Sequence, residues 1–533
     1  MRLKFPVPLS LVAALLVAAA CHREDPEPMK TPLLVAVSVS ETTFVIPSGG
    51  SVEVSFRVAD PDYVFNFFVD EADCQVRLAA KDGKAPSEFR LSRIVAGTEK
   101  GLYTATLTET GEEEDYSREV RLLIQTGSDT YTPSEYFTVR SEGAGYGILV
   151  KTGLPTVYID TENGKAVNSK EEYVKASVKI KGTGQYESLA ETACEIRGRG
   201  NTTWYWPKKP YLVKLEEKQH IFGMHKHKRW VLLANFMDRT LMRNLVSMKV
   251  SSMTKLAWTP GCVPVELVLN GKHQGSYLLI EQVRVDNHRV NITEMTKDDN
   301  SGNAVTGGYL LELDFHYDNE VQWRDPHGDI PFGVKYPDPD DLTAQQLTYI
   351  KKYVYDAAEA LYGAGFRDPV KGWRAYLDEE SFIDYWIVFE VMGYHELGNP
   401  GSVYMHKDRG GKLVAGPCWD FDWGVLSYNT SPQAKTGLIN GSAIWYGRLR
   451  QDPAFEAKLK ARFDELLPQL QTIPDYMDEC EKLLTASAKY NFAMWNPAED
   501  GVINGDEKLT FQDAVKRLKS IYQERLKVIP SKL

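Results

Sequence analysis

The alternation of apolar and polar residues predicts β-strands through the first part of the chain. Four short segments have a period of two, and they are residues 51–58, 103–108, 118–124 and 136–140. Successive side chains of a strand point to opposite faces, so this pattern places one face on a core and the other in solvent. Short strands at regular spacing predict an all-β, immunoglobulin-like sandwich over residues 33–143.

A glycine-rich linker at 141–147 precedes a second unit, in which strands come first and helices follow. Further strands are predicted at 155–160, 174–180, 211–215 and 307–314, together with a hairpin at 265–283. The turn of the hairpin is Asn270-Gly271, a dipeptide favoured in two-residue loops. Helical periodicity appears at 342–361, 381–392, 455–470 and 511–528. This order predicts an α+β unit with two lobes over residues 146–533, rather than a doubly wound sheet.

The N-terminus has the pattern of an export signal. Arg2 and Lys4 precede an apolar run at 5–20 that is too short for a membrane span, and the run ends V-A-A-A-C at Cys21. We expect a lipoprotein signal peptide over 1–21 with lipid on Cys21, and a secretory signal cleaved nearby is the alternative. Residues 22–32 are polar and rich in proline, which predicts a tether, and their acidic residues resemble the surface-export signal of Bacteroides-type lipoproteins. The expected location is the cell envelope, lipid-anchored to the outer membrane and exposed at the surface.

Composition and the absence of several motifs exclude some functions. The net charge of −11 argues against a nucleic-acid partner. The six cysteines form no C-x-x-C pair, so the sequence signals neither a zinc ribbon nor a thioredoxin-type site. It also contains no P-loop, no zincin motif and no nucleophile elbow.

The first candidate for chemistry is the stretch R-G-R-G-N at 197–201, followed by a strand that carries Lys214. Glycine allows close backbone approach to a ligand, and guanidinium groups match phosphate oxygens in pairs. A phosphate cradle fits these residue types, and an ordinary surface turn is the alternative.

The second candidate is the stretch W-D-F-D-W, which carries Asp420 and Asp422. If the segment is extended, both carboxylates lie on one face, framed by aromatic residues. Buried carboxylates need a cation or hydrogen-bond donors, and Mg²⁺ suits two carboxylates together with phosphate oxygens. The alternative is a capped turn that is paired with an arginine.

Residues 390–408 and the turn and strand that follow them, G-G and K-L-V-A, lead into this acidic pair through a helix end, a polar loop and a β-hairpin. The loop carries His395, Glu396 and Asn399. The order of these elements is that of the catalytic and metal-binding loops of protein kinases. His395 taken alone is more often a helix cap or a packed residue.

Four blocks of the sequence are R-G-R-G-N-T-T-W, K-R-W-V-L-L-A-N-F-M-D-R-T-L-M-R-N, E-L-V-L-N-G-K-H-Q-G-S-Y-L-L-I-E-Q-V and G-P-C-W-D-F-D-W-G. Together they resemble the spore-coat protein H (CotH) kinase family, and the resemblance covers about 155–528. The resemblance implies an atypical protein-kinase-like fold that uses ATP with Mg²⁺ or Mn²⁺, and family members of the spore-coat type phosphorylate secreted proteins.

The resemblance also implies roles for particular residues. The phosphate-facing turn would consist of Arg197, Gly198, Arg199, Gly200 and Asn201. Lys214 would contact the α- and β-phosphates, Glu281 would lie on the adenine or hinge side, and Asp420 and Asp422 would hold the metal. Asp238 and Arg243, on the helix after N-F, would pair and fix that helix against the cradle.

The pattern departs from protein kinases in the catalytic loop. Glu396 stands where kinases have an aspartate that orients the acceptor hydroxyl, and Asn399 or Ser402 would serve the second metal. The longer glutamate displaces its carboxylate by about one methylene, which affects rate where geometry is tight.

The expected function is therefore a surface-anchored phosphotransferase that uses ATP and a divalent metal to phosphorylate an extracytoplasmic protein. The alternative is a catalytically inert, kinase-like lipoprotein that binds a glycan or a protein. For that alternative, the sequence offers four tryptophans for sugar stacking, which otherwise belong to the core: Trp204, Trp206, Trp323 and Trp373.

Overall fold

A computed structural model describes most of the chain beyond the N-terminal segment. The described residues are 37–46, 51–59, 76–110, 116–125, 131–141, 152–317, 319–499, 501 and 503–533. The predicted signal peptide, Cys21 and the tether lie outside these ranges.

The first described unit, residues 37–141, consists of two sheets that share one core. One sheet has the order β1-β3-β6-β5, and the other has the order β2-β9-β7-β4 with β8 beside β7. The strands are β1 (Val37–Val39), β2 (Thr43–Ile46), β3 (Ser51–Val58), β4 (Val76–Ala80), β5 (Phe89–Ala96), β6 (Leu102–Glu109), β7 (Ser117–Gln125), β8 (Tyr131–Pro133) and β9 (Phe137–Ser141). Alternate residues such as Val54, Leu107 and Val120 are buried between the sheets. The four predicted strands are confirmed as β3, β6, β7 and β9.

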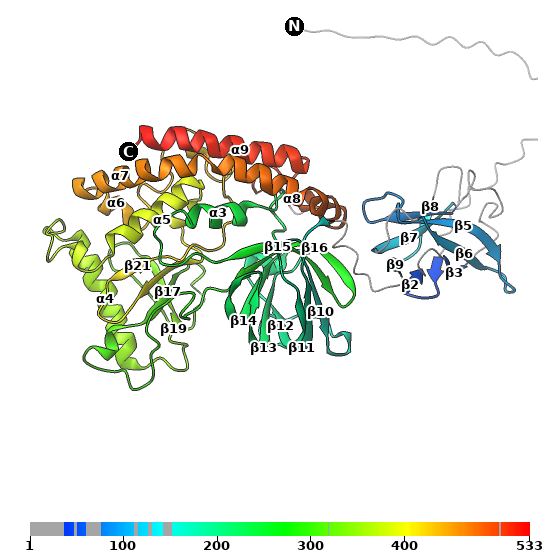
Figure 1. The fold of residues 1–533 in the computed structure, drawn as a ribbon, viewed down its shortest axis with the longest axis horizontal. Helices are drawn as coiled ribbons and strands as arrows, with labels where there is room; N and C mark the ends of the chain where they lie inside the picture. Colours follow the sequence, from blue (N-terminus) through cyan, green and yellow to red (C-terminus); the bar gives the residue numbers. More distant parts are fainter. Residues whose placement is uncertain are drawn as a thin grey trace, which may run out of the picture.

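The second unit begins with a closed barrel. Its strand order is β10-β11-β12-β13-β14-β16-β15, and a parallel pairing of β10 with β15 closes it. The strands are β10 (Thr156–Thr161), β11 (Val174–Lys181), β12 (Leu189–Gly198), β13 (Tyr211–Ile221), β14 (Met224–Leu233), β15 (Cys262–Leu269) and β16 (Lys272–Glu281). The predicted hairpin is β15–β16, and both turn residues, Asn270 and Gly271, have positive φ. Figure 1 shows the barrel between the sandwich and the rest of the chain.

A five-stranded antiparallel sheet follows, with the order β18-β19-β17-β20-β21. The strands are β17 (Tyr309–Leu313), β18 (Gln322–Arg324), β19 (Pro331–Tyr336), β20 (Val403–Lys407) and β21 (Leu413–Ala415). Strands β17 and β20 are paired on both sides, so neither is an edge strand. The predicted strand at 307–314 is confirmed as β17, and the hairpin expected after residue 402 is β20–β21.

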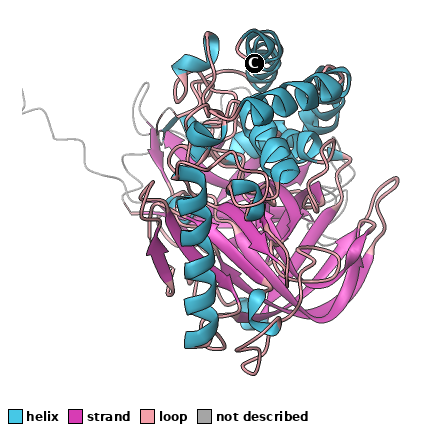
Figure 2. Ribbon diagram, turned by 90° about the vertical axis from the view of Figure 1, so that its left-hand side faces the viewer, coloured by secondary structure: helices cyan, strands magenta, loops and turns pink. Residues whose placement is uncertain are grey.

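Helices cover the sheet and extend over the barrel. They are α2 (Thr202–Tyr205), α3 (Arg243–Ser251), α4 (Ala344–Tyr362), α5 (Glu379–Val391), α6 (Tyr446–Leu449), α7 (Pro453–Leu470), α8 (Ile473–Met494) and α9 (Phe511–Val528). Short 3-10 helices are η3 (Glu162–Gly164), η4 (Ala304–Thr306), η5 (Trp373–Ala375), η6 (His395–Leu397), η7 (Pro432–Lys435), η8 (Pro497–Glu499) and η9 (Ile529–Ser531). The four predicted helices are confirmed as α4, α5, α7 and α9, each within a few residues. Figure 2 shows the helices gathered mainly on one side of the strands.

One continuous core joins these elements. It contains Leu212, Val231 and Leu278 from the barrel, together with residues of the five-stranded sheet and of the long helices. The barrel has its own interior core of alternate residues such as Ile196, Val213 and Leu232. The expectation of a mixed helix and sheet unit is confirmed. None of the helices in the described ranges is both long enough and apolar enough to span a membrane.

Candidate functional site

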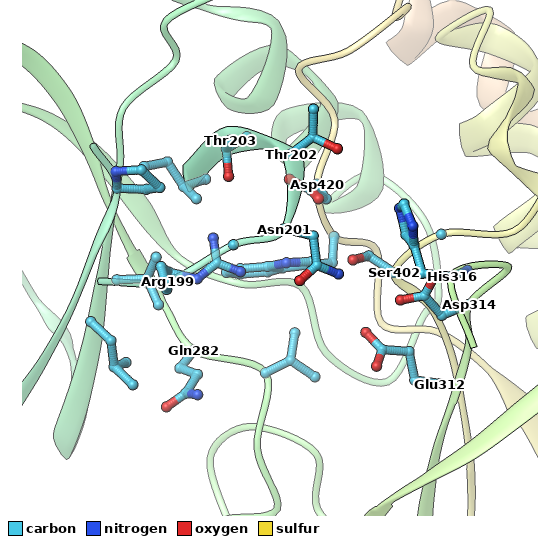
Figure 3. A pocket seen from close by; sticks show the side chains of 18 of the residues that line it. Arg199, Asn201, Thr202, Thr203, Gln282, Glu312, Asp314, His316, Ser402 and Asp420 are labelled. Carbon is cyan, nitrogen blue, oxygen red and sulfur yellow. The ribbon is translucent and has the colours of Figure 1, made fainter. Parts of the chain in front are cut away.

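A cavity of about 660 Å³ lies where the barrel meets the five-stranded sheet. The barrel contributes residues 197–201, which we call the arginine turn, and residues 282–285, which follow β16. The other side is formed by the end of β17, by residues 401, 402 and 404, and by residues 419, 420, 422 and 423. The last four belong to a segment we call the acid loop (416–426). Figure 3 shows Arg199 and Gln282 on one side, Asp314 and His316 on the other, and Asp420 between them.

The acid loop directs both aspartates into the cavity. Phe421 is fully buried between them, with its ring 4.8 Å from that of Phe389 and 4.7 Å from that of Tyr394. Asp420 has a φ of 65°, in the left-handed region that aspartate tolerates better than most residues. Asp420 and Asp422 both line the cavity because the aromatic residue between them is anchored in the core.

Residues of two neighbouring segments hold the backbone of this loop. The Phe421 N–H donates to the Asn244 side chain at 2.8 Å, and Arg243 Nε donates to the Val425 carbonyl at 2.8 Å. The Gly424 N–H donates to Asn504 Oδ1 at 2.8 Å, so the segment before α9 also takes part. The loop is thereby fixed from α3 and from the segment before α9.

Arg243 and Asp238 form the ion pair that the sequence predicted. Their atoms Nη1 and Oδ1 are 2.5 Å apart, and Arg243 Nη2 is also 2.5 Å from Asp506 Oδ2. All three side chains are fully buried, so removal of one partner leaves an uncompensated charge. Asp238 lies in the turn before α3, whose first residue is Arg243.

Arg199 supplies positive charge beside the aspartates. Its guanidinium lies 5.4 Å from the centroid of the Trp419 ring, a cation–π contact that orients the side chain. Its charge lowers the pKa of both Asp420 and Asp422, against the larger effect of burial.

Arg197 is oriented differently from Arg199. Its Nη1 donates to the Lys170 carbonyl, and its guanidinium lies 4.9 Å from the centroid of the Tyr173 ring. Arg197 therefore lines the cavity while it is also bound to the segment before β11.

The two glycines of the arginine turn are required by packing within the turn. A Cβ on Gly198 would lie 2.2 Å from the Trp204 ring, and a Cβ on Gly200 would lie 2.1 Å from Thr203 Oγ1. Gly200 also has a φ of 87°, which favours glycine. The glycines thus make room for α2, whose Thr202 and Thr203 line the cavity, and Asn201 is the residue that precedes this helix.

The carboxylates of the cavity raise one another's pKa values. Burial first, and then the charges of Asp420 and Asp238, raise the pKa of Asp422 to about 8. Burial also raises the pKa of Asp420, helped by Glu312 and opposed by Arg199 and by a hydrogen bond from Ser402. The pKa of Glu396 is well above its usual range because of burial and the charge of Asp420. Acids crowded in this way favour a bound cation.

The carboxylates of the cavity fit a divalent cation such as Mg²⁺ that binds together with phosphate groups. Within the described ranges, no group of three or more His, Cys, Asp or Glu residues forms a metal site. Mg²⁺ usually keeps several waters and takes only one or two protein carboxylates together with phosphate oxygens. Asp420 and Asp422 supply that number, and Arg199 offers a guanidinium for phosphate.

Three residues predicted for the site do not line the cavity. Lys214 points away from the barrel interior, because its neighbours Val213 and Leu215 face inward, and its Nζ lies 2.9 Å from Glu195 Oε2. Glu281 is buried and its Oε2 accepts the Gly261 N–H at 2.9 Å, although the next residue, Gln282, does line the cavity. Asn399 is exposed to solvent on the loop after η6.

The structure adds acidic and polar residues that the sequence did not single out. Glu312 and Asp314 come from the end of β17, and Glu312 accepts from Tyr404 Oη at 2.8 Å. The segment L-E-L-D shows an acidic residue inside an apolar strand, which is a signal that buried carboxylates face a polar site. The sequence around Asn504 gave no signal of its role, because that role depends on its contact with the acid loop in the folded protein.

A guanidinium set beside paired carboxylates is an arrangement suited to phosphate groups and a divalent cation. Residues 196–529 match the family model described as CotH kinase protein. The match covers more than half of the chain, so the protein belongs to this family, as the sequence blocks indicated. Membership implies a kinase-like function and, in general terms, the use of nucleotide and metal. A search of curated proteins found no match.

Proposed function

We propose that this protein is an ATP-dependent phosphotransferase whose nucleotide and divalent metal bind in the cavity between the barrel and the five-stranded sheet. The barrel and the helical part would then be the two lobes of a kinase-like domain. The observation that carries this proposal is that Arg199, Asp420 and Asp422 line one cavity although they are far apart in the sequence.

The basic and acidic side chains of the cavity would have different roles. Arg199 would bind phosphate oxygens, in place of the strand lysine that Lys214 was expected to supply. Asp420 and Asp422 would hold Mg²⁺ or Mn²⁺, which when bound neutralises phosphate charge. Val283 and Val285, which follow Gln282 and line the cavity, would offer apolar contact to the base. Glu396 would orient the acceptor hydroxyl and accept its proton.

Binding of Mg²⁺–ATP to the full chain tests this function. We expect calorimetry to detect ATP binding that requires Mg²⁺ and that is lost in the double variant Asp420→Asn with Asp422→Asn. These substitutions keep the size and shape of both side chains and remove their negative charge. ATP binding of equal affinity in the double variant would contradict the proposal.

We further propose that lipid on Cys21 anchors the protein to the outer membrane at the cell surface, so that its acceptor would be extracytoplasmic; a protein is the acceptor that the family resemblance implies. The support is the apolar run followed by small residues and a cysteine. Metabolic labelling with a radioactive fatty acid should mark the protein and should fail on Cys21→Ser. Equal labelling of this variant would place the lipid elsewhere.

A further inference from the structure

Two exposed aromatic rings line the cavity, and a third lies on a helix beside it. Phe315 is 41% exposed and Trp423 is 42% exposed, and both line the cavity. Tyr205, which is 82% exposed, lies on α2 beside the cavity-lining Thr202 and Thr203. Rings left open beside a polar site are available to a ligand. By contrast, Trp323 and Trp373, which the sequence offered for sugar stacking, are buried core residues.

Phe315 and Glu396 both lie next to Gly401. A Cβ built on Gly401 would lie 3.4 Å from Phe315 Cε1 and 3.5 Å from Glu396 Oε2, so ring and carboxylate flank the same glycine. The ring also contacts the ring of His316 in a tilted arrangement, with centroids 4.1 Å apart, and the Phe315 N–H donates to the Pro400 carbonyl at 2.6 Å. The ring therefore has a fixed position next to the group that would orient the acceptor.

Trp423 provides a second ring at the acidic end of the cavity. It follows Asp422 directly, and the next residue, Gly424, is held by Asn504. The nucleotide base is assigned to the opposite end, near Gln282, which Figure 3 shows on the far side of the cavity from Asp314. Phe315 and Trp423 thus border the part of the cavity left for the acceptor.

We propose that the acceptor is a saccharide, whose pyranose ring packs on Phe315 and Trp423 and whose hydroxyl faces Glu396. This inference rests on the proposed function. The acceptor oxygen forms a bond to the γ-phosphorus of ATP, and the bond from that phosphorus to the β,γ-bridging oxygen breaks. The electron pair leaves with ADP, and the hydroxyl proton passes to the Glu396 carboxylate.

The surroundings favour a sugar over a peptide. A sugar ring has an apolar C–H face that packs on aromatic rings, and hydroxyl groups that donate to carboxylates such as Asp314 and Glu396. An extended peptide commonly binds by adding to a free strand edge. The strands that border the acidic end, β17 and β20, are paired on both sides and offer no such edge.

Calorimetry on the full chain with Mg²⁺ and a non-hydrolysable ATP analogue tests the proposal. The probes are cellohexaose, maltohexaose, mannohexaose and hexagalacturonate. We expect at least one of them to bind, and Phe315→Ala with Trp423→Ala to weaken that binding by roughly tenfold or more. Binding of the ATP analogue should still be detected in this double variant, which separates loss of the sugar site from loss of the nucleotide site. Val370→Ala is the matched control, because Val370 is 75% exposed and does not line the cavity.

Three results would overturn the proposal. They are no binding of any probe, unchanged binding in the double variant, or labelled phosphate transferred to a tyrosine- or serine-containing peptide and to none of the sugars. Failure of the proposed function has a different signature, because the ATP analogue itself would then not bind to the unmodified chain.

Discussion

At the residue scale, the site depends on which side chains reach the cavity. Arg199 and Lys214 were both expected at phosphate, and only Arg199 lines the cavity. The reason is strand alternation: Lys214 is flanked by inward-facing residues and pairs with Glu195 on the barrel surface. The sequence pattern identified the basic residue types of the site. It did not show which of the two, Arg199 or Lys214, faces the aspartates.

The first prediction compares these two cations. Arg199→Ala should weaken Mg²⁺–ATP binding by about 1.5–3 kcal/mol, since a charge-assisted hydrogen bond is lost. Lys214→Ala should change it by less than about 0.5 kcal/mol, as is usual for an exposed ion pair. Calorimetry on both variants decides the matter, and a larger loss for Lys214→Ala would reverse the assignment.

A second prediction concerns the backbone of the acid loop. Asn504→Ala removes the acceptor of the Gly424 N–H and should lower stability by about 1–3 kcal/mol, because a buried donor is left unpaired. It should also weaken Mg²⁺ binding, because Asp422 loses its fixed position. Asn399→Ala is the control, since Asn399 is exposed. Denaturant titration and Mg²⁺ titration measure the two effects, and equal values for both variants would contradict this role.

At the scale of elements, Lys208 ties the barrel to the helices. It is fully buried, and its Nζ donates to the Ala234 carbonyl at 2.8 Å and to Asn491 Oδ1, on α8, at 2.7 Å. Burial lowers the pKa of Lys208 to about 7. Lys208 therefore joins the residue after β14 and strand β16, through the Ser276 carbonyl, to α8.

This burial predicts a pH dependence. Between pH 7 and 10.5 the unfolded chain keeps the Lys208 proton and the folded chain does not, so the unfolded state binds more protons. The contribution of Lys208 to stability should therefore rise with pH in this window, by at most about 1.4 kcal/mol per pH unit. Lys208→Met should lack this rise when denaturant unfolding is compared from pH 7 to 10. Parallel curves for the two proteins would show that Lys208 does not titrate there.

The elements themselves were predicted where their signal is local. Alternation identified β3 and β6, and the Asn270-Gly271 turn identified the hairpin. Closure of the barrel was not predicted, because it pairs Thr156 with Glu266, which are distant in the sequence. Helix α8 was also missed, because its buried face includes the polar residues Ser487 and Asn491, which interrupt the apolar stripe.

At the scale of the whole molecule, the family match and the cavity lie within the same part of the chain. The match begins in β12 and ends in η9, and every residue that lines the cavity lies between Lys170 and Ile503. The sandwich contacts the barrel through Glu119 and Lys272, whose side chains form an exposed ion pair. Of the described residues of the sandwich, none lines the cavity of the candidate site.

It follows that residues 152–533 should bind Mg²⁺–ATP with an affinity within about twofold of that of the full chain, since surface ion pairs contribute little. Calorimetry on both proteins checks this, with circular dichroism to show that the shorter protein is folded. A folded fragment that has lost binding would mean that the sandwich takes part in the site.

The most direct test of the central claim is a crystal structure with Mn²⁺ and a non-hydrolysable ATP analogue. Anomalous scattering locates the manganese independently of the protein coordinates. The account predicts a manganese peak at Asp420 and Asp422, with the phosphates bound by Arg199. Manganese and nucleotide bound outside this cavity, with the two aspartates free of metal, would contradict it.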